Sequence, residues 1–333
     1  MKGYLFCNTP EIIKESSSGG AFSAIVTAVS QKENQDVIVY GAAFDEHLNL
    51  VHQRYEAKED YSSLRGSKYV FSEYNKSLMQ VKEDLIKGAY VIFTGTPCQV
   101  YALKSFLDRE NLNTNNLLTI DLICHGSPEK SLWQQYKEWL EKRHKKKIKS
   151  FSFRYKGMRW HGYSLMAEFE DGERIVNSHD LQVYMDLYFT HQIMRRSCYQ
   201  CKFSSTDRPG DITLGDFWGV EDIFSGIITQ KQKEAGVSLI TVNSDKGKGI
   251  IELLTNMSVE FNWILHKCID DSFIKYQTGL NSPTVKPDDN EAFREYMSKY
   301  GFDATLSKYA GFNLKGRIRY YIKYLANYIG LIK

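Results

Sequence analysis

The chain has 333 residues, of which 42% are hydrophobic and 25% charged, as is typical of a globular protein with about two domains. The formal net charge of +3 is too small to indicate a nucleic-acid partner. No run of about 18 apolar residues exists, so we expect no membrane-spanning helix. The start of the chain lacks a signal-peptide pattern, and we therefore expect a cytoplasmic protein in which structural disulfides are rare.

Strand and helix patterns alternate over residues 1–147. The predicted strands are 4–6, 37–44, 90–93 and 117–123, and the predicted helices are 21–29, 76–86, 99–107 and 132–147. Strand 90–93, helix 99–107 and strand 117–123 form one unit whose two strands should be parallel. Ligands bind such sheets beyond the carboxyl ends of the strands. Because Cys98 and Cys124 both lie there, we expect them to face one another.

The periodicity changes from helical to alternating near residue 148. The predicted elements that follow are strand 151–155, a hairpin of 163–170 and 173–177, helix 180–191, strands 211–215 and 237–243, loop 281–289 and a basic amphipathic helix over 312–333. We therefore expect an α/β (mixed α+β) fold: a mixed sheet with flanking helices, a second β-rich subdomain and C-terminal helices. The expected division is 1–147 (α/β), 148–245 (β-rich, with the cysteine pair) and 246–333 (helical).

Four cysteines carry the strongest indication of a metal or cluster site. Cys198 and Cys201 form a C-Y-Q-C pair, which places two thiolates on one tight turn. With Cys98 and Cys124 they make four sulfur ligands, a set that suits tetrahedral zinc and iron–sulfur clusters alike. The alternative is that Cys98 and Cys124 are small buried apolar residues. The other two cysteines, at 7 and 268, have no partner spacing and are expected to be core or surface thiols.

Small-residue loops mark further candidate sites. Residues 16–20 (S-S-S-G-G) open a helix, and they are either a phosphate cradle or a plain capped turn. Residues 65–69 combine cations, small residues and an aromatic ring. His125 follows Cys124 and either relays a proton or only forms structural hydrogen bonds. Asp216 directly follows the predicted strand 211–215 and is close in sequence to Trp218. Neither G-x-G-x-x-G nor a P-loop occurs, which disfavours a Rossmann or P-loop site.

Seven ordered motifs give the chain a resemblance to a known family. They are S-S-S-G-G-A-F-S (16–23), R-G-S-K-Y-V (65–70), F-T-G-T-P-C-Q-V (93–100), D-L-I-C-H-G-S-P (121–128), F-R-Y-K-G (153–157), R-R-S-C-Y-Q-C-K-F (195–203) and D-I-T-L-G-D-F-W-G (211–219). Over residues 4–245 the chain resembles the beta subunits of coenzyme F-420 (deazaflavin) hydrogenases and dehydrogenases, in a short form without the ferredoxin-like segment found in front of many members. The resemblance therefore implies a separate electron donor, such as a ferredoxin.

The resemblance implies two cofactors, FAD and a 4Fe–4S cluster. It implies cluster ligands at Cys98, Cys124, Cys198 and Cys201. It implies flavin contacts, all within the 1–147 part, at Ser17, Ser18, Gly19, Gly20, Ser67, Lys68, Tyr69, Thr94, Gly95 and Thr96.

The function that we expect is that of an iron–sulfur flavoprotein oxidoreductase, similar to deazaflavin reductases. It would pass electrons between the cluster, FAD and a small organic acceptor, with His125 or Asp216 supplying the proton. Short relatives in bacterial surface-polysaccharide gene sets suggest a link to polysaccharide biosynthesis. The alternatives are a zinc-stapled protein and a cofactor-free component of a glycan pathway.

The tail 312–333 suggests a peripheral contact with the inner face of the membrane, because Lys315, Arg317, Arg319 and Lys323 accompany an apolar helix face. Packing of this tail on the body or on a second subunit is the alternative.

Overall fold

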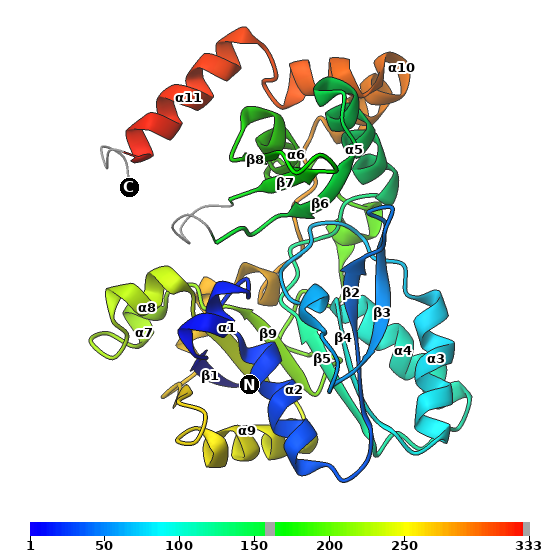
Figure 1. Ribbon diagram of the computed structural model, residues 1–333, viewed down its shortest axis with the longest axis vertical. Coiled ribbons are helices and arrows are strands. Elements are labelled where there is room, and N and C mark those ends of the chain that lie inside the picture. Colours follow the sequence, from blue (N-terminus) through cyan, green and yellow to red (C-terminus); the bar gives the residue numbers. More distant parts are fainter. Residues whose placement is uncertain (157–163, 329–333) are drawn as a thin grey trace.

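The computed structural model describes residues 1–156 and 164–328. In this part of the chain, one large and one small sheet are flanked by helices (Figure 1). The large sheet consists of β1 (Lys2–Cys7), β2 (Val37–Phe44), β3 (Leu50–Glu56), β4 (Tyr90–Gly95), β5 (Leu117–Leu122), β9 (Ile212–Asp216), β10 (Ser238–Val242) and β11 (Ile264–Lys267). Their order is β11-β1-β10-β9-β5-β4-β2-β3. The predicted mixed α/β fold is confirmed.

The centre of the large sheet is parallel, and this aligns the strand ends that carry the candidate site. β2, β4, β5 and β9 run parallel, whereas β1, β3, β10 and β11 join by antiparallel pairing. Gly95 of β4 pairs with Asp121 of β5, which pairs with Thr213 of β9. The carboxyl ends of these three strands therefore meet at one edge, as expected for strands joined by the crossover helix α4 (Pro97–Arg109).

Helices cover both faces of the large sheet. α2 (Ala21–Lys32) and α9 (Asp245–Met257) bury one face, and α3 (Asn75–Ile86) and α4 bury the other (Figure 1). In β2, Val39 belongs to the first core and Tyr40 to the second, as the two-residue period of a strand requires. Burial on both faces explains why the central strands are mostly apolar on both of their faces.

The small sheet lies beyond the carboxyl edge of the large one (Figure 1). It consists of β6 (Ile148–Ser152), β7 (Met166–Phe169) and β8 (Arg174–Val176), and it packs with α5 (Lys130–His144), α6 (His179–Phe189) and α10 (Asn290–Tyr309). Its core is aromatic: Trp133, Phe153 and Tyr184 are fully buried. Phe44, at the end of β2, stacks on Trp133 with a centroid distance of 5.3 Å, which joins the two sheets.

The remaining described elements are short, apart from the last helix. They are α1 (Pro10–Lys14), α7 (Val220–Ile223), α8 (Gln230–Ala235), α11 (Leu314–Tyr328) and the 3-10 helices η1 (Ser62–Leu64), η2 (Arg196–Gln200), η3 (Ser272–Tyr276) and η4 (Thr278–Leu280). Among the described residues, no helix is both long and apolar enough to cross a membrane.

The sheets group the strands differently from the predicted division at residues 147 and 245. β9 and β10 pair with strands of the first 147 residues, and β11 extends the same sheet. The division into functional domains stays a prediction. Tyr163 of the predicted hairpin, Gly157 of the F-R-Y-K-G motif and residues 329–333 of the predicted tail helix lie outside the described residues.

Candidate functional site

The site begins at Cys98, the second residue of α4. Its helix starts at a fixed point, because Pro97 is the first helical residue and Thr96 is the cap. The Gln99 side chain accepts hydrogen bonds from the backbone N–H and the hydroxyl of Thr96, both at 2.9 Å. Cys98 is exposed, and its sulfur lies 3.2 Å from the Thr96 hydroxyl. Thr96 thus has a structural role beside the first predicted ligand.

Cys124 lies on the turn that follows β5. Gly126, at φ +114°, lets the chain fold back so that its N–H donates to the Cys124 sulfur at 3.4 Å. A Cβ atom on Gly126 would lie 3.0 Å from the Met194 sulfur and 3.5 Å from the Cys198 Cβ. The turn after β5 therefore packs against the segment that carries the cysteine pair.

Cys198 and Cys201 lie on and just after η2. The N–H of Ser127 donates to the Cys198 sulfur at 3.4 Å, and the N–H of Arg195 donates to the carbonyl of Ser127 at 3.0 Å. Neighbouring residues 126 and 127 thus direct their N–H groups at the sulfurs of two different cysteines. Hydrogen bonds of this kind stabilise sulfur that carries negative charge.

The four predicted ligands lie in one neighbourhood. Burial, with smaller contributions from the charges of Cys98, Cys198 and Cys201, raises the pKa of Cys124 to about 12. Burial likewise raises the pKa of Cys198, with Cys98 and Cys201 contributing. Among the described residues, however, no group of three or more Cys, His, Asp or Glu side chains is arranged to hold a metal ion. The thiols are close enough to repel one another as thiolates, but their side chains are not arranged around a common point where a metal ion could bind.

The predicted 16–20 loop docks on β10. The Ser18 hydroxyl donates to the carbonyl of Val237 at 2.7 Å, and the N–H of Gly19 donates to the Ser238 hydroxyl at 2.9 Å. A Cβ on Gly19 would lie 2.3 Å from the carbonyl oxygen of Phe6, so only glycine fits there. Gly20 has φ +79° and is the N-cap of α2. Ser18 and Gly19 thus hold the loop on β10, and the loop leads directly into α2.

The predicted 65–69 segment lies against this loop. The N–H of Ser67 donates to the Ser17 hydroxyl at 2.5 Å, so two predicted flavin contacts touch. The Lys68 ammonium donates to the carbonyls of Ser63 and Arg65 at 2.7 Å, and desolvation lowers its pKa to about 7. Lys68 therefore bonds within its own segment.

Arg154 joins these residues to the end of β9, and sequence reasoning did not single it out. Its guanidinium donates to Asp216 Oδ2 and to the Tyr69 hydroxyl, each at 3.1 Å, and to the Ser17 carbonyl at 3.4 Å. The F-R-Y-K-G motif, which contains Arg154, was the sequence feature that could have identified it. Asp216, predicted as a proton donor, is held in this ion pair, of which both side chains are largely buried.

Lys156 comes from the same motif. Its ammonium donates to the carbonyls of Ile13, Ser18 and Ala235 at 2.7–3.0 Å, and burial lowers its pKa to about 7. It anchors the 16–20 loop to the ends of α1 and α8.

His125, the other predicted proton donor, directly follows Cys124 and is close enough to Asp216 to feel its charge. Its Nδ1 is 3.2 Å from the Thr278 hydroxyl, which comes from η4. The residue is exposed, but desolvation by the surrounding protein lowers its pKa; His191 adds to the effect and Asp216 opposes it. Neutral at physiological pH, the ring can accept or donate a proton there.

Thr94 and Gly95, at the end of β4, complete the predicted set. The Thr94 hydroxyl is buried and has no hydrogen-bond partner within the described residues. By strand alternation from Ile92, it lies on the α2 face of the sheet, where the 16–20 loop also lies. Gly95 packs against His52 and Gln99. The unpartnered hydroxyl is the kind of group that a bound polar molecule would satisfy.

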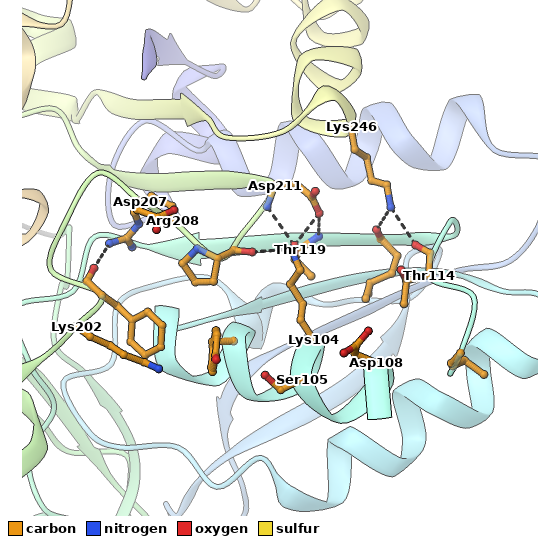
Figure 2. A pocket seen from close by; sticks show the side chains of 15 residues that line it. Lys104, Ser105, Asp108, Thr114, Thr119, Lys202, Asp207, Arg208, Asp211 and Lys246 are labelled. Atoms are coloured by element: carbon orange, nitrogen blue, oxygen red, sulfur yellow. Dashed lines mark hydrogen bonds between the residues drawn. The ribbon is translucent and has the colours of Figure 1, made fainter. Parts of the chain in front are cut away.

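A pocket of about 660 Å³ lies on the α4 side of the large sheet, and some of its lining residues are close in sequence to the cysteines (Figure 2). Tyr101 is one turn beyond Cys98, and Lys202 and Phe203 directly follow Cys201. Figure 2 shows Lys202 at one end and Lys246 with Thr114 at the other. Lys246 donates to the Thr114 carbonyl at 3.0 Å. Among the cations that line the pocket, Lys202 is the nearest to a cysteine in sequence. None of the predicted site residues lines this pocket.

Comparisons with known proteins agree with this arrangement. The family model for the C terminus of the coenzyme F420 hydrogenase/dehydrogenase beta subunit matches residues 88–262, a range that contains the four cysteines, His125 and Asp216. A chain of the F420-reducing [NiFe] hydrogenase complex from Methanosarcina barkeri, solved with xenon, has a similar fold. The TM-score is 0.54 at 16% identity, covering 91% of this chain and 94% of that one. No curated protein matches. The match over more than half of the sequence shows that this chain belongs to the coenzyme F420 hydrogenase/dehydrogenase beta subunit family.

Proposed function

We propose that this protein is an iron–sulfur flavoprotein oxidoreductase, which is a finer assignment than the redox-related role that its family indicates. The observation that carries the proposal is the meeting of four thiols with two backbone N–H donors at one sheet edge. Burial raises the pKa of Cys124 and of Cys198, so a cation is needed to keep these two as thiolates. An all-sulfur donor set with N–H···S hydrogen bonds fits a 4Fe–4S cluster.

In this proposal the chain's own residues divide the work. Cys98, Cys124, Cys198 and Cys201 would hold the cluster, and Gly126 and Ser127 would donate hydrogen bonds to its ligands. When bound, the cluster would supply single-electron transfer and the flavin hydride transfer. His125, exposed at one edge and beside the Asp216 charge, would hold the proton that accompanies reduction of the acceptor.

The flavin side of the proposal is supported by contacts among the predicted residues. Ser17 contacts Ser67, and Arg154 joins Ser17, Tyr69 and Asp216. The unpartnered Thr94 hydroxyl would donate to the flavin. The start of α2 has no side-chain cap and no acidic residue in its first turn, which suits a pyrophosphate group.

The donor that we propose is a separate protein such as a ferredoxin, docking over the α4-side pocket. Cys98 is the exposed cysteine of the set, and Lys202, which directly follows Cys201 on the chain, lines this pocket. Lys202→Glu should slow reduction by an acidic ferredoxin and leave reduction by dithionite unchanged, as measured by stopped-flow absorbance. Equal slowing with both reductants would contradict this docking side.

The acceptor that we propose is a small organic molecule, a deazaflavin or an intermediate of surface-polysaccharide biosynthesis, handled in the cytoplasm. Reduction of the bound flavin, followed by mixing with F420 or with a nucleotide sugar, distinguishes the two classes. If neither F420 nor the nucleotide sugar reoxidises the flavin, both proposed classes of acceptor are ruled out.

The test of the proposed cofactors is purification without oxygen, followed by a visible spectrum and analysis of iron, acid-labile sulfide, zinc and FAD. We expect a brown protein with about four iron atoms per chain and bound FAD. Ala substitution at any of the four cysteines should remove the cluster absorbance, whereas the buried Cys268→Ala, outside the set, should keep it. A colourless protein with one zinc would favour a zinc staple, and one with neither metal nor flavin would favour a cofactor-free glycan-pathway component.

A further inference from the structure

α11 is held to the molecule through one of its faces. The Tyr320 hydroxyl donates to the carbonyl of Asn177 at 2.5 Å, and the Tyr320 ring lies 5.2 Å from that of His179. Just before the helix, Phe312 stacks on His179 at 5.1 Å and meets Trp139 edge-on at 5.0 Å. Phe312 and Tyr320 thus pack this segment on the body of the protein, and this packing covers only one side of α11.

The opposite face of α11 presents apolar side chains to solvent. Leu314 is 75% exposed, Ile318 53%, Tyr321 46% and Ile322 62%. Their spacing of four, three and one residues puts them on one side of a helix. Figure 1 shows α11 at the outside of the molecule, extending from α10 past the small sheet. Exposed apolar side chains in such a row mark an interaction surface.

The charges that flank this row are all positive. Lys315, Arg317 and Arg319 are exposed, Arg317 also lies 3.8 Å from the Asp180 carboxylate of α6, and the sequence has no Asp or Glu from residue 312 to 333. An amphipathic helix with cations beside its apolar row suits the interface of a membrane that contains anionic lipids. A second copy fits less well, because a twofold contact through this face would bring the cations of both helices together.

We propose that α11 binds the surface of an anionic bilayer, lying in the membrane plane with its apolar row (Leu314, Ile318, Tyr321 and Ile322) in the headgroup region. The face that packs on α6 would stay in place, so the small sheet and its helices would be held next to the lipid. This inference does not depend on the cofactors, since no predicted ligand or flavin contact lies in α11.

The experiment is flotation of the full chain with vesicles of phosphatidylcholine alone or mixed with phosphatidylglycerol. We expect the protein to float with the mixed vesicles and to stay behind with phosphatidylcholine, and added salt should weaken the binding. Ile318→Ser/Ile322→Ser and Lys315→Glu/Arg319→Glu should each weaken binding by about tenfold or more.

The matched controls are Ile86→Ser and Lys76→Glu/Lys87→Glu, which make the same changes on exposed residues in or next to α3. These variants should bind like the unaltered protein. Equal flotation with both vesicle types, or equal loss of binding in the controls, would overturn the inference. So would an absence of binding together with a concentration-dependent dimer that the Ile318→Ser/Ile322→Ser variant abolishes.

Discussion

A single guanidinium, that of Arg154, joins segments that lie far apart in the sequence. It contacts Ser17, Tyr69 and Asp216, and its side chain is 7% exposed while that of Asp216 is 13% exposed. A charge this deeply buried depends on its partner, because an unpaired carboxylate loses its hydration without compensation. The sequence showed the R-Y-K motif but not these contacts, which exist only once residues 17, 69, 154 and 216 are brought together by the fold.

We expect Arg154→Met to lower the free energy of unfolding by about 3 kcal/mol, because it leaves Asp216 without its counter-ion. The control is Arg174→Met, which breaks a pair with Glu168 in which the arginine is 60% exposed and should cost less than about 1 kcal/mol. Urea denaturation of both variants measures the difference. Losses of equal size would show that the Arg154 pair is no more important than a surface contact.

His52 gives the stability of the molecule a dependence on pH that does not involve the cysteines. Its ring is buried between the Thr94 carbonyl at 3.1 Å and the Ser72 hydroxyl at 3.1 Å, and it stacks on Phe93 at 5.1 Å. Burial, together with the charge of Lys68 and against the hydrogen bond to Thr94, lowers the pKa of His52 from 6.5 to about 4. The folded protein therefore keeps this ring neutral at pH values at which the unfolded chain protonates it.

The stability that His52 contributes should be complete above pH 6.5 and lost as the pH falls from 6.5 to 4. The unfolded state binds the proton first, and the pKa difference corresponds to about 3 kcal/mol. His52→Gln should reduce the loss of stability over this range relative to the unaltered protein, as measured by urea denaturation at both pH values. Parallel pH profiles for the two proteins would show that His52 titrates normally in the folded state.

At the scale of elements, the strength of the sequence signal followed the degree of burial. β2, β4 and β5 were predicted because helices cover both of their faces and most of their residues are apolar. β3 and β11 were missed because they are edge strands: β3 reads Leu-Val-His-Gln-Arg-Tyr-Glu, and β11 has four residues, none of them buried. Their pairing with β2 and β1 decides their structure, and a local pattern does not reveal such pairing.

The start of α4 sets the position of a predicted ligand. Thr96 and Gln99 form the cap that fixes the first turn, and Cys98 lies inside it. We expect Thr96→Ala to lower the free energy of unfolding by about 1 kcal/mol and also to lower the iron content. Thr229→Ala removes the equivalent cap of α8, far from the cysteines in sequence, and should lower stability alone. Iron analysis of both variants checks this, and equal iron contents would mean that the α4 cap does not position Cys98.

For the whole molecule, the order of the strands in the large sheet could not be predicted from the sequence. The crossover from β4 to β5 followed from a local strand–helix–strand pattern. The position of β9 beside β5 did not, because about 90 residues and the small sheet separate the two in the chain. That pairing brings Asp216 to the edge where Cys98 and Cys124 follow their strands, and hydrogen bonds of Ser127 with Arg195 and Cys198 hold the cysteine pair at the same edge. Residue types and spacing thus identified the ligand candidates, while the topology explains why they share a neighbourhood.

We propose that iron lies among the sulfurs of four cysteines that are distant in the sequence. The most direct test is anomalous diffraction at the iron absorption edge from crystals grown without oxygen. We expect strong iron peaks within bonding distance, about 2.3 Å, of the sulfurs of Cys98, Cys124, Cys198 and Cys201. A signal at the zinc edge alone, no metal signal, or an iron site that leaves out Cys98 or Cys124 would contradict it.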